Sequence, residues 1–204
     1  AKGKPMQASS LPPLPGPPRL FTSLPEALAV KPLSEVKRLV LTDSAQIFSP
    51  QLSQLSSLEE LILKDSLTRL PASVASLKQL RMLDVSGNRL STLPAWIARL
   101  PRLHTLKLAD NAFTTLPDWM STLIAKGKPL RSLHLEHNRL TRLPDSLANL
   151  TEGRLDIRIR GNAFSEEYLA SHTRLPQGGL ASKEELTHAP LFENLSEALR
   201  QPER

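Results

Sequence analysis

The chain has 204 residues, 40% of them hydrophobic, which is enough apolar material for a continuous core and argues against disorder throughout. It has no cysteine, so disulfide bonds, thiolate metal sites and a cysteine nucleophile are excluded. The formal net charge of +6 suggests an acidic partner, such as an acidic protein surface, anionic lipid or nucleic acid.

Residues 1–20 are predicted to form a flexible, proline-rich leader. The stretch from Ala1 to Pro18 has six prolines and reads LPPLPGPP at its centre, which favours an extended polyproline conformation over a packed core. Its match to an SH3 ligand is imperfect, so a linker is the favoured interpretation. It lacks the apolar middle of a secretory signal. No stretch of the sequence has the roughly 18 to 20 consecutive apolar residues of a membrane span, and we expect a soluble protein.

Residues 21–172 are predicted to form a repeat domain with N- and C-terminal caps. About six repeats of 22 to 27 residues run from Leu33 to Phe164. The asparagines that set their register are Asn88, Asn111, Asn138 and Asn162. The segments that match the pattern LxxLxLxxN most closely are LRMLDVSGN at 80–88, LHTLKLADN at 103–111 and LRSLHLEHN at 130–138.

The first and last units depart from this pattern. Two early units, at 36–44 and 58–66, keep the apolar spacing but lack the asparagine: Ser44 ends the first, and Asp65 or Ser66 lies near the asparagine position in the second. The last unit, LDIRIRGN at 155–162, has isoleucines in place of leucines, and β-branched residues suit a strand.

The repeat pattern predicts an α/β fold. Each LxL pair alternates with polar residues, so one side of the strand points into the core while the other forms a parallel, concave sheet. The asparagine amides are expected to bond the backbone of their own turn and of the neighbouring repeat, as a ladder. Leu-Pro steps turn the chain into the convex side. We therefore predict a leucine-rich-repeat solenoid with a parallel concave β-sheet and short 3₁₀ or α segments on the convex side.

One repeat is longer than the others. It has four extra residues within DWMSTLIAKGKP at 118–129, about one helical turn. We predict an α-helix from Asp118 to Ala125, with Gly127 as a left-handed cap and Pro129 just beyond. The neighbouring convex segments should be shorter and 3₁₀ in type.

The C-terminal part is predicted to close the solenoid and then continue as a tail. SEEYLASH at 165–172 should form a short helix, capped by Ser165, over the open core of the last repeat. Residues 173–204 are predicted to be a tail or linker with a short amphipathic helix in PLFENLSEALRQ at 190–201.

The concave face is the predicted partner-binding surface. Its central column comprises Val40, Ile62, Asp84, Lys107, His134 and Arg158, with Met82 in the column before it and Arg160 in the column after it. The N-terminal end of this face is apolar and its C-terminal end basic, which suits a partner with an apolar patch beside an acidic one. Ordinary surface variation explains the pattern equally well.

Two tryptophans form a second candidate site. Trp96 and Trp119 occupy the same position of successive repeats, in LPAW and LPDW, so they should be neighbours on the convex edge. Adjacent tryptophans could form a binding hot spot. The favoured interpretation is that each covers the core of its own repeat.

No residues point to chemistry within the chain. His134 and His137 lie near a strand end and should point in different directions, so no metal site is predicted. The sequence has no glycine-rich phosphate loop and no nucleophile with supporting motifs. We predict no catalytic site, no cofactor and no specific nucleic-acid partner.

The pattern LPxWIxxLxxLxxLxLxxNxLxxLP, the absence of cysteine and the proline-rich leader together resemble the leucine-rich-repeat effectors that pathogenic bacteria deliver by type III secretion, over about residues 20–172. The resemblance implies a virulence protein that is secreted into the host cell, acts in its cytoplasm and binds a host protein; we expect a monomer. GNAFSEEYLASH at 161–172 looks like the repeat exit of effectors whose repeats present substrates to an attached E3 ubiquitin ligase domain. The longer repeats here favour the plant-pathogen type of effector.

Three function hypotheses follow. The first is a protein-recognition module that binds a host protein on its concave face. The alternative is the substrate-recognition domain of an E3 ubiquitin ligase whose catalytic domain lies outside this chain, which leaves the question of enzymatic activity open. The third is weak, salt-sensitive binding to a nucleic acid or a membrane surface through the positive charge.

Overall fold

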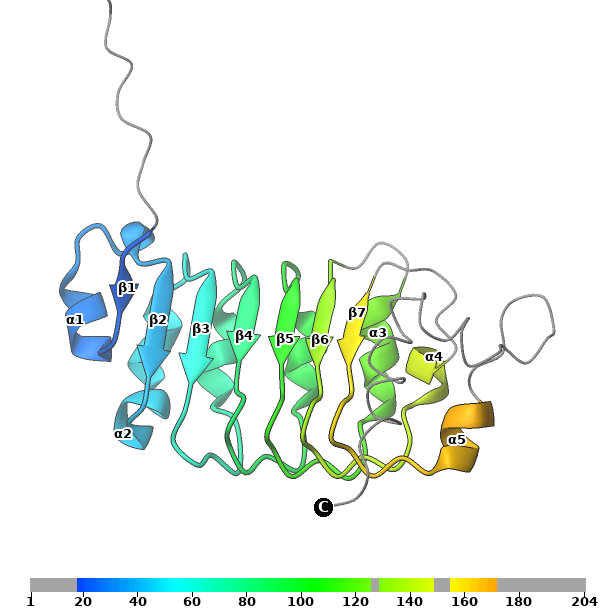
Figure 1. The fold of residues 1–204 in the computed structure, drawn as a ribbon. Helices are drawn as coiled ribbons and strands as arrows, with labels where there is room; N and C mark the ends of the chain where they lie inside the picture. Colours follow the sequence, from blue (N-terminus) through cyan, green and yellow to red (C-terminus); the bar gives the residue numbers. More distant parts are fainter. Residues whose placement is uncertain (1–17, 126–128, 149–154, 172–204) are drawn as a thin grey trace, which may run out of the picture.

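The protein is built around one parallel sheet, seen in a computed structural model that describes residues 18–125, 129–148 and 155–171 (Figure 1). In these residues the sheet has seven strands, which follow one another in chain order as expected of a solenoid. The strands are β1 (Leu20–Phe21), β2 (Arg38–Leu41), β3 (Glu60–Leu63), β4 (Met82–Asp84), β5 (Thr105–Lys107), β6 (Ser132–His134) and β7 (Asp156–Arg158). The six predicted repeats correspond to β2–β7, and β1 begins at Leu20, one residue before the predicted start of the domain.

The core lies between the sheet and the convex side and consists mainly of leucine. The strand residues that point into it are paired from strand to strand and almost completely buried: Phe21, Leu39, Leu61, Leu83, Leu106, Leu133 and Ile157. The period-two alternation of a strand accounts for this arrangement. Burying one such side chain contributes about 1.5 to 3 kcal/mol relative to leaving it exposed, so the continuous stack stabilises the whole array.

The convex side carries short helical segments, as predicted. The N-terminal part has α1 (Leu24–Ala29), η1 (Leu33–Glu35), α2 (Ser44–Ile47) and η2 (Pro50–Gln54), where η denotes a 3₁₀ helix. The remainder has η3 (Ala72–Ser76), η4 (Ala95–Arg99), η5 (Asp118–Met120), α3 (Ser121–Ile124), α4 (Asp145–Ala148) and α5 (Glu166–Ser171). Pro71, Pro94 and Pro117 are the N-caps of η3, η4 and η5, so the Leu-Pro steps mark the entry to the convex side.

The asparagine ladder is confirmed. The Nδ2 of Asn138 donates to the carbonyl oxygens of Leu135 in its own repeat (3.1 Å) and Leu108 in the repeat before (3.0 Å), while its Oδ1 accepts from the amide of Phe113 (3.1 Å). Equivalent bonds are made by Asn88, Asn111 and Asn162. In the degenerate repeat before them, Asp65 takes this place, and its carboxylate accepts from the amide of Ser44 (2.7 Å).

The helix in the long repeat differs from the prediction. Asp118–Met120 forms the 3₁₀ helix η5, and only Ser121–Ile124 forms the α-helix α3, so a continuous α-helix from Asp118 to Ala125 is wrong. The first turn after Pro117 has the 3₁₀ form that also follows Pro71 and Pro94 in the preceding repeats. The extra residues then continue as α-helix. Gly127 lies outside the described residues.

Both ends of the solenoid carry a cap. At the N-terminal end, Ser23 caps α1 through its side chain, and the side-chain oxygen of Gln46 accepts from the amide of Leu24 (2.7 Å). At the C-terminal end, the hydroxyl of Ser165 accepts from the amide of Tyr168 (3.1 Å), which confirms the predicted cap of α5. Phe164 and Tyr168 stack on each other and pack against the core. The leader before Pro18 and the predicted tail helix at 190–201 lie outside the described residues.

Candidate functional site

The concave columns lie where the repeat register predicts them. In the central column, Val40 pairs with Ile62, Ile62 with Asp84, Asp84 with Lys107, Lys107 with His134 and His134 with Arg158. Met82 lies in the column before it, between Glu60 and Thr105. The structure therefore brings these predicted site residues together as one strip across β2–β7. Arg160 follows β7, two residues beyond Arg158, as predicted from the alternation.

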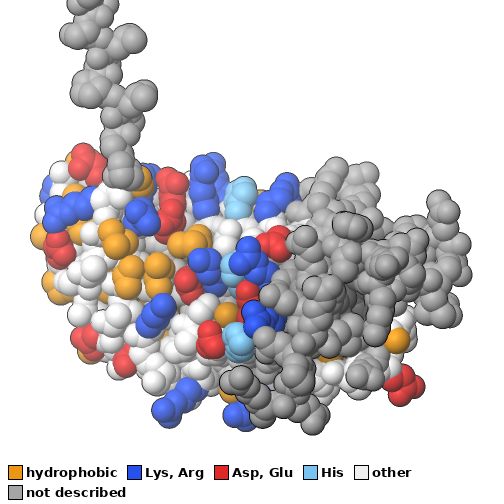
Figure 2. Space-filling view, in the orientation of Figure 1, with side chains coloured by type: hydrophobic (Ala, Val, Ile, Leu, Met, Phe, Trp, Pro, Cys, Tyr) orange, Lys and Arg blue, Asp and Glu red, His pale blue; other side chains and the backbone are white. Residues whose placement is uncertain are grey.

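An apolar patch occupies the N-terminal half of the strip. We define it as Val40, Ile62 and Met82, on the adjacent strands β2, β3 and β4, and all three side chains are partly exposed. Figure 2 shows hydrophobic side chains gathered over this part of the sheet, with charged side chains beyond them toward β7. Leu20, on β1, is the exposed large hydrophobic residue among those described, at 44% exposure. The patch is bounded on one side by the ion pair of Arg38 with Glu60 (2.6 Å).

Asp84 is more buried than predicted. We expected its side chain to face solvent, but the residue is only 9% exposed. Its Oδ1 accepts a hydrogen bond from the amide of Ser86 (3.0 Å), and its Oδ2 lies 3.8 Å from the Nζ of Lys107. A buried carboxylate requires such compensation, because removal from water disfavours its charge. The carboxylate of Asp84 therefore helps to hold the backbone at Ser86 and the side chain of Lys107 in place, and only a small part of it is available to a partner.

The predicted basic end of the face is balanced by carboxylates. We define the polar cluster by the charged side chains on and beside β4–β7: Asp84, Lys107, His134, Glu136, Asp156, Arg158 and Arg160. Arg158 Nε lies 3.2 Å from Asp156 Oδ2, and Lys107 lies beside Asp84. With His134 neutral, the three cations are matched by three carboxylates. The prediction of a basic end rested on Lys107, His134, Arg158 and Arg160, whereas Asp156 and Glu136, in the columns on either side of the central one, supply negative charge that compensates them.

His134 lies at the centre of the polar cluster. Its side chain is 17% exposed, its Nε2 lies 2.9 Å from the hydroxyl of Ser132, and its Nδ1 lies 3.9 Å from Glu136 Oε1. Burial lowers the pKa of His134 from its ordinary value. The carboxylate of Glu136 opposes that shift, and the positive charges of Arg158 and Lys107 reinforce it. The neutral imidazole is accordingly the favoured form near neutral pH.

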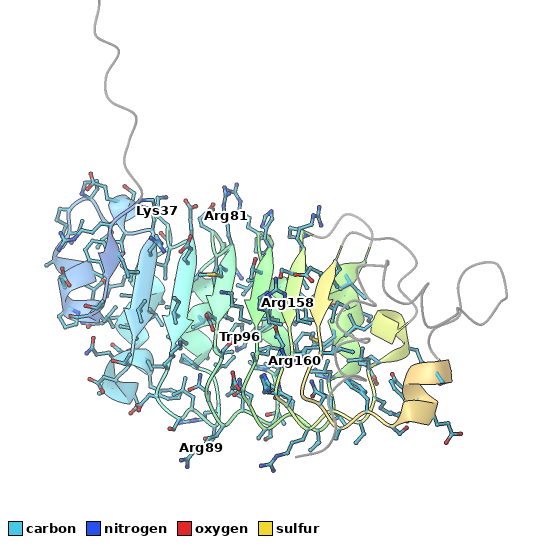
Figure 3. All side chains as sticks on the ribbon, in the orientation of Figure 1. Lys37, Arg81, Arg89, Trp96, Arg158 and Arg160 are labelled. Atoms are coloured by element: carbon cyan, nitrogen blue, oxygen red, sulfur yellow. The ribbon has the colours of Figure 1, made fainter. Side chains whose placement is uncertain are left out.

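A second row of charges was not identified from the sequence. Lys37 and Arg81, near the start of β2 and β4, flank Glu59, with Nζ to Oε1 at 3.1 Å and Nε to Oε2 at 3.4 Å (Figure 3). The signal was available, since each residue directly follows the apolar residue that opens its LxxLxL segment. These side chains are partly exposed, so their ion pairs contribute little to stability.

The two tryptophans lie on the convex side. Trp96 in η4 and Trp119 in η5 are both partly buried and pack against the hydrophobic core. Their segments contact each other, as expected for equivalent positions of successive repeats. This packing is what the core-covering interpretation predicts.

The described residues also bear on metal and membrane binding. Within residues 18–125, 129–148 and 155–171, no group of three or more histidine, aspartate or glutamate side chains is placed to hold a metal ion. In the same residues no helix has the length and apolar character needed to cross a membrane.

The parallel sheet, the asparagine ladder and the Leu-Pro turns define a leucine-rich-repeat solenoid. A family model described as Leucine Rich Repeat matches residues 79–100 and 129–150, the repeats of β4 and β6. A comparison with curated protein sequences finds no match.

Solved structures share the fold. The chain is similar to a leucine-rich-repeat protein of Leptospira interrogans, with a TM-score of 0.56 and 24% identity over 74% of this chain and 44% of that one. It is also similar to the leucine-rich-repeat domain of the type III effector XopL, with a TM-score of 0.52 and 24% identity over 70% of this chain and 51% of that one. The chain thus spans about half the length of these structures or less.

Proposed function

We propose that this chain is a protein-recognition module that binds another protein on its concave face, with the apolar patch at the centre of the contact. The carrying observation is that Val40, Ile62 and Met82, on three adjacent strands, each leave part of their apolar surface exposed on the same face. Contiguous exposed apolar surface of this kind marks interaction sites. Burying it against a partner contributes about 25 cal/mol per Å² of apolar area.

The surroundings of the patch favour a specific contact. The Arg38–Glu60 ion pair and the Asp84–Lys107 pair border the patch, so a partner that covers it must also match charges at its edge. Interfaces are commonly built this way, with an apolar centre that supplies affinity and a polar rim that supplies specificity.

The biological setting forms part of the proposal. The repeat pattern and the proline-rich leader support a bacterial effector that is delivered by type III secretion and binds a host protein in the host cytoplasm. The fold shared with the XopL repeat domain is compatible with this setting. A role as the substrate-recognition part of an E3 ubiquitin ligase is a second candidate, supported by the sequence GNAFSEEYLASH at 161–172. Ubiquitination assays on the full gene product, with and without this segment, would separate the two.

Site-specific photocrosslinking tests the binding face. A photoreactive amino acid replaces Ile62 on the concave face or, as the matched control, the exposed Ala95 on the convex side. In host-cell extract, we expect a discrete crosslinked protein from position 62 and none from position 95. The substitution Ile62→Glu should weaken capture of that protein at least about tenfold, whereas Ala95→Glu should leave it unchanged. Crosslinking from position 95 alone would contradict the proposal.

A further inference from the structure

The polar cluster is finely balanced in charge. Its cations Lys107, Arg158 and Arg160 are equal in number to its carboxylates Asp84, Glu136 and Asp156; Lys107 pairs with Asp84 and Arg158 with Asp156, and the remaining titratable member is His134. Figure 3 shows Arg158 and Arg160 on the concave side of the sheet, over its C-terminal half. Because the other charges of the cluster cancel in number among the described residues, one proton on the imidazole adds a net positive charge to it.

Charged groups surround His134 on each neighbouring strand. Lys107 faces it from β5, while Arg158 and Asp156 face it from β7. On its own strand the nearest polar groups are Ser132 and, just beyond the strand end, Glu136. Burial, reinforced by the positive side chains of Arg158 and Lys107, lowers the pKa of His134 against the opposing effect of Glu136, and a further negative group close to the imidazole would raise it.

Glu136 supplies an unusual acceptor. Its Oε2 is buried, and no hydrogen-bond donor from the described part of the chain contacts it. Burying a hydrogen-bond acceptor without a donor destabilises the folded protein, so a new donor close to the Glu136 carboxylate would be stabilised there. The Nδ1 of His134 lies 3.9 Å from Glu136 Oε1. Protonation gives the imidazole a donor on both nitrogens, so Nε2–H donates to the hydroxyl of Ser132 while Nδ1–H faces the Glu136 carboxylate at an ion-pair distance.

We propose that protonation of His134 converts the polar cluster into a positively charged surface that binds a carboxylate-bearing segment of the partner, beside the apolar patch. The inference rests on the proposed function and specifies its partner: a segment whose apolar side chains cover β2–β4 and whose acidic side chains lie over β5–β7. Binding of such a segment takes up a proton, because a carboxylate close to the imidazole favours its charged form. Mild acid therefore strengthens the contact.

The first test measures His134 in the full chain without a partner. NMR titration of the imidazole follows its midpoint in the wild type, in Glu136→Gln and in Arg158→Gln. We expect the midpoint to fall in Glu136→Gln, which removes an attractive carboxylate, and to rise in Arg158→Gln, which removes a repulsive cation. Midpoints that both match the wild type would show that His134 is not coupled to the cluster and would overturn the proposal.

The second test measures binding of a defined probe to the full chain. The probe is a fluorescent peptide in which leucines are followed by glutamates, and its control carries glutamines instead. We expect binding of the glutamate peptide to be about two- to fivefold tighter at about pH 5.5 than at about pH 7.5, as one added ion pair allows. The change should vanish in His134→Gln and with the glutamine peptide.

The outcomes separate this inference from the proposed function. Equal affinity of the glutamate peptide at both pH values, or no binding at either, overturns the acidic-partner assignment while crosslinking from position 62 still stands. Loss of crosslinking at position 62 overturns the proposed function itself. His134→Gln and the wild type should have the same thermal unfolding midpoint at about pH 7.5, where both side chains are uncharged, and this comparison excludes misfolding as the cause.

Discussion

The side-chain amide of Asn88 donates a hydrogen bond to the carbonyl oxygen of Leu63, which lies 25 residues earlier in the chain and 2.9 Å away. The same side-chain nitrogen also donates to the carbonyl oxygen of Val85 in its own repeat, and the side-chain oxygen of Asn88 accepts from the backbone amide of Leu67 (2.9 Å). One buried side chain therefore satisfies backbone groups of two successive repeats. A substitution at the asparagine position therefore affects the backbone of two repeats at once.

Replacement of a ladder asparagine should destabilise the protein strongly. Asn138→Ala leaves the backbone groups of Leu108, Leu135 and Phe113 without their side-chain partner inside the core, so we expect a loss of about 1 to 3 kcal/mol in the free energy of unfolding. Urea denaturation followed by circular dichroism measures it. The exposed neighbour Arg139, changed to alanine, is the control and should stay within about 0.5 kcal/mol. Equal losses in the two variants would contradict the ladder's role.

The C-terminal cap should depend on one hydroxyl. Tyr168 Oη accepts from the amide of Leu143 (2.7 Å) and donates to the carbonyl oxygen of the same residue (3.2 Å). Tyr168→Phe keeps the stacking on Phe164 but leaves both backbone groups without this partner, so we expect about 1 to 2 kcal/mol of destabilisation. Hydrogen exchange at the Leu143 amide should accelerate in the variant. Unchanged exchange there would show that the hydroxyl does not hold the cap.

Two glycines offer a matched pair. Gly161 and Gly87 both have positive φ, +69° and +72°, so alanine at either position should cost about 1 to 2 kcal/mol in backbone strain. At Gly161 the added Cβ would lie 2.5 Å from His137 Nδ1, whereas at Gly87 it meets nothing within 4 Å. We expect Gly161→Ala to be the more destabilising change in thermal unfolding. His137→Ala in the same chain should remove the excess; persistence of the excess would exclude this contact as its cause.

Stability should depend on pH through His134. Its pKa in the folded protein lies below the ordinary histidine value, so the unfolded chain binds the proton more tightly. The stabilisation is complete above the unfolded pKa and is lost as the pH falls through the folded pKa. Urea denaturation at a series of pH values between about 7.5 and 5 should therefore show a decline that is shallower in His134→Gln. An identical slope in both proteins would contradict the assignment.

Much of the face could be predicted because strand geometry is periodic. The alternation around Leu61, Leu83 and Leu106 assigns each neighbouring residue to one side of the sheet, and equal turns keep successive strands in register. The columns containing Ile62 and Lys107 follow from that pattern alone. Strand β1 was not predicted, because Leu20–Phe21 is too short to show any alternation.

What could not be predicted depends on distances between columns. The burial of Asp84 is compensated by the amide of Ser86 and by Lys107, and the charges around His134 include Asp156 and Glu136, which lie in other columns. The column to which a residue belongs gives the side of the sheet that its side chain faces. It does not give the distances between the charged ends of extended side chains in different columns. The electrostatics of the site therefore emerge only in three dimensions.

The ladder also suggests how such an array lengthens. Asn111, Asn138 and Asn162 each bond the repeat that precedes them, so every unit carries the residue that joins it to its predecessor. A duplicated repeat contains the asparagine that bonds it to the repeat before it, so the preceding repeat needs no compensating substitution. Gene duplication can then add whole repeats in a single step, and the partner-binding face can broaden by one strand at a time.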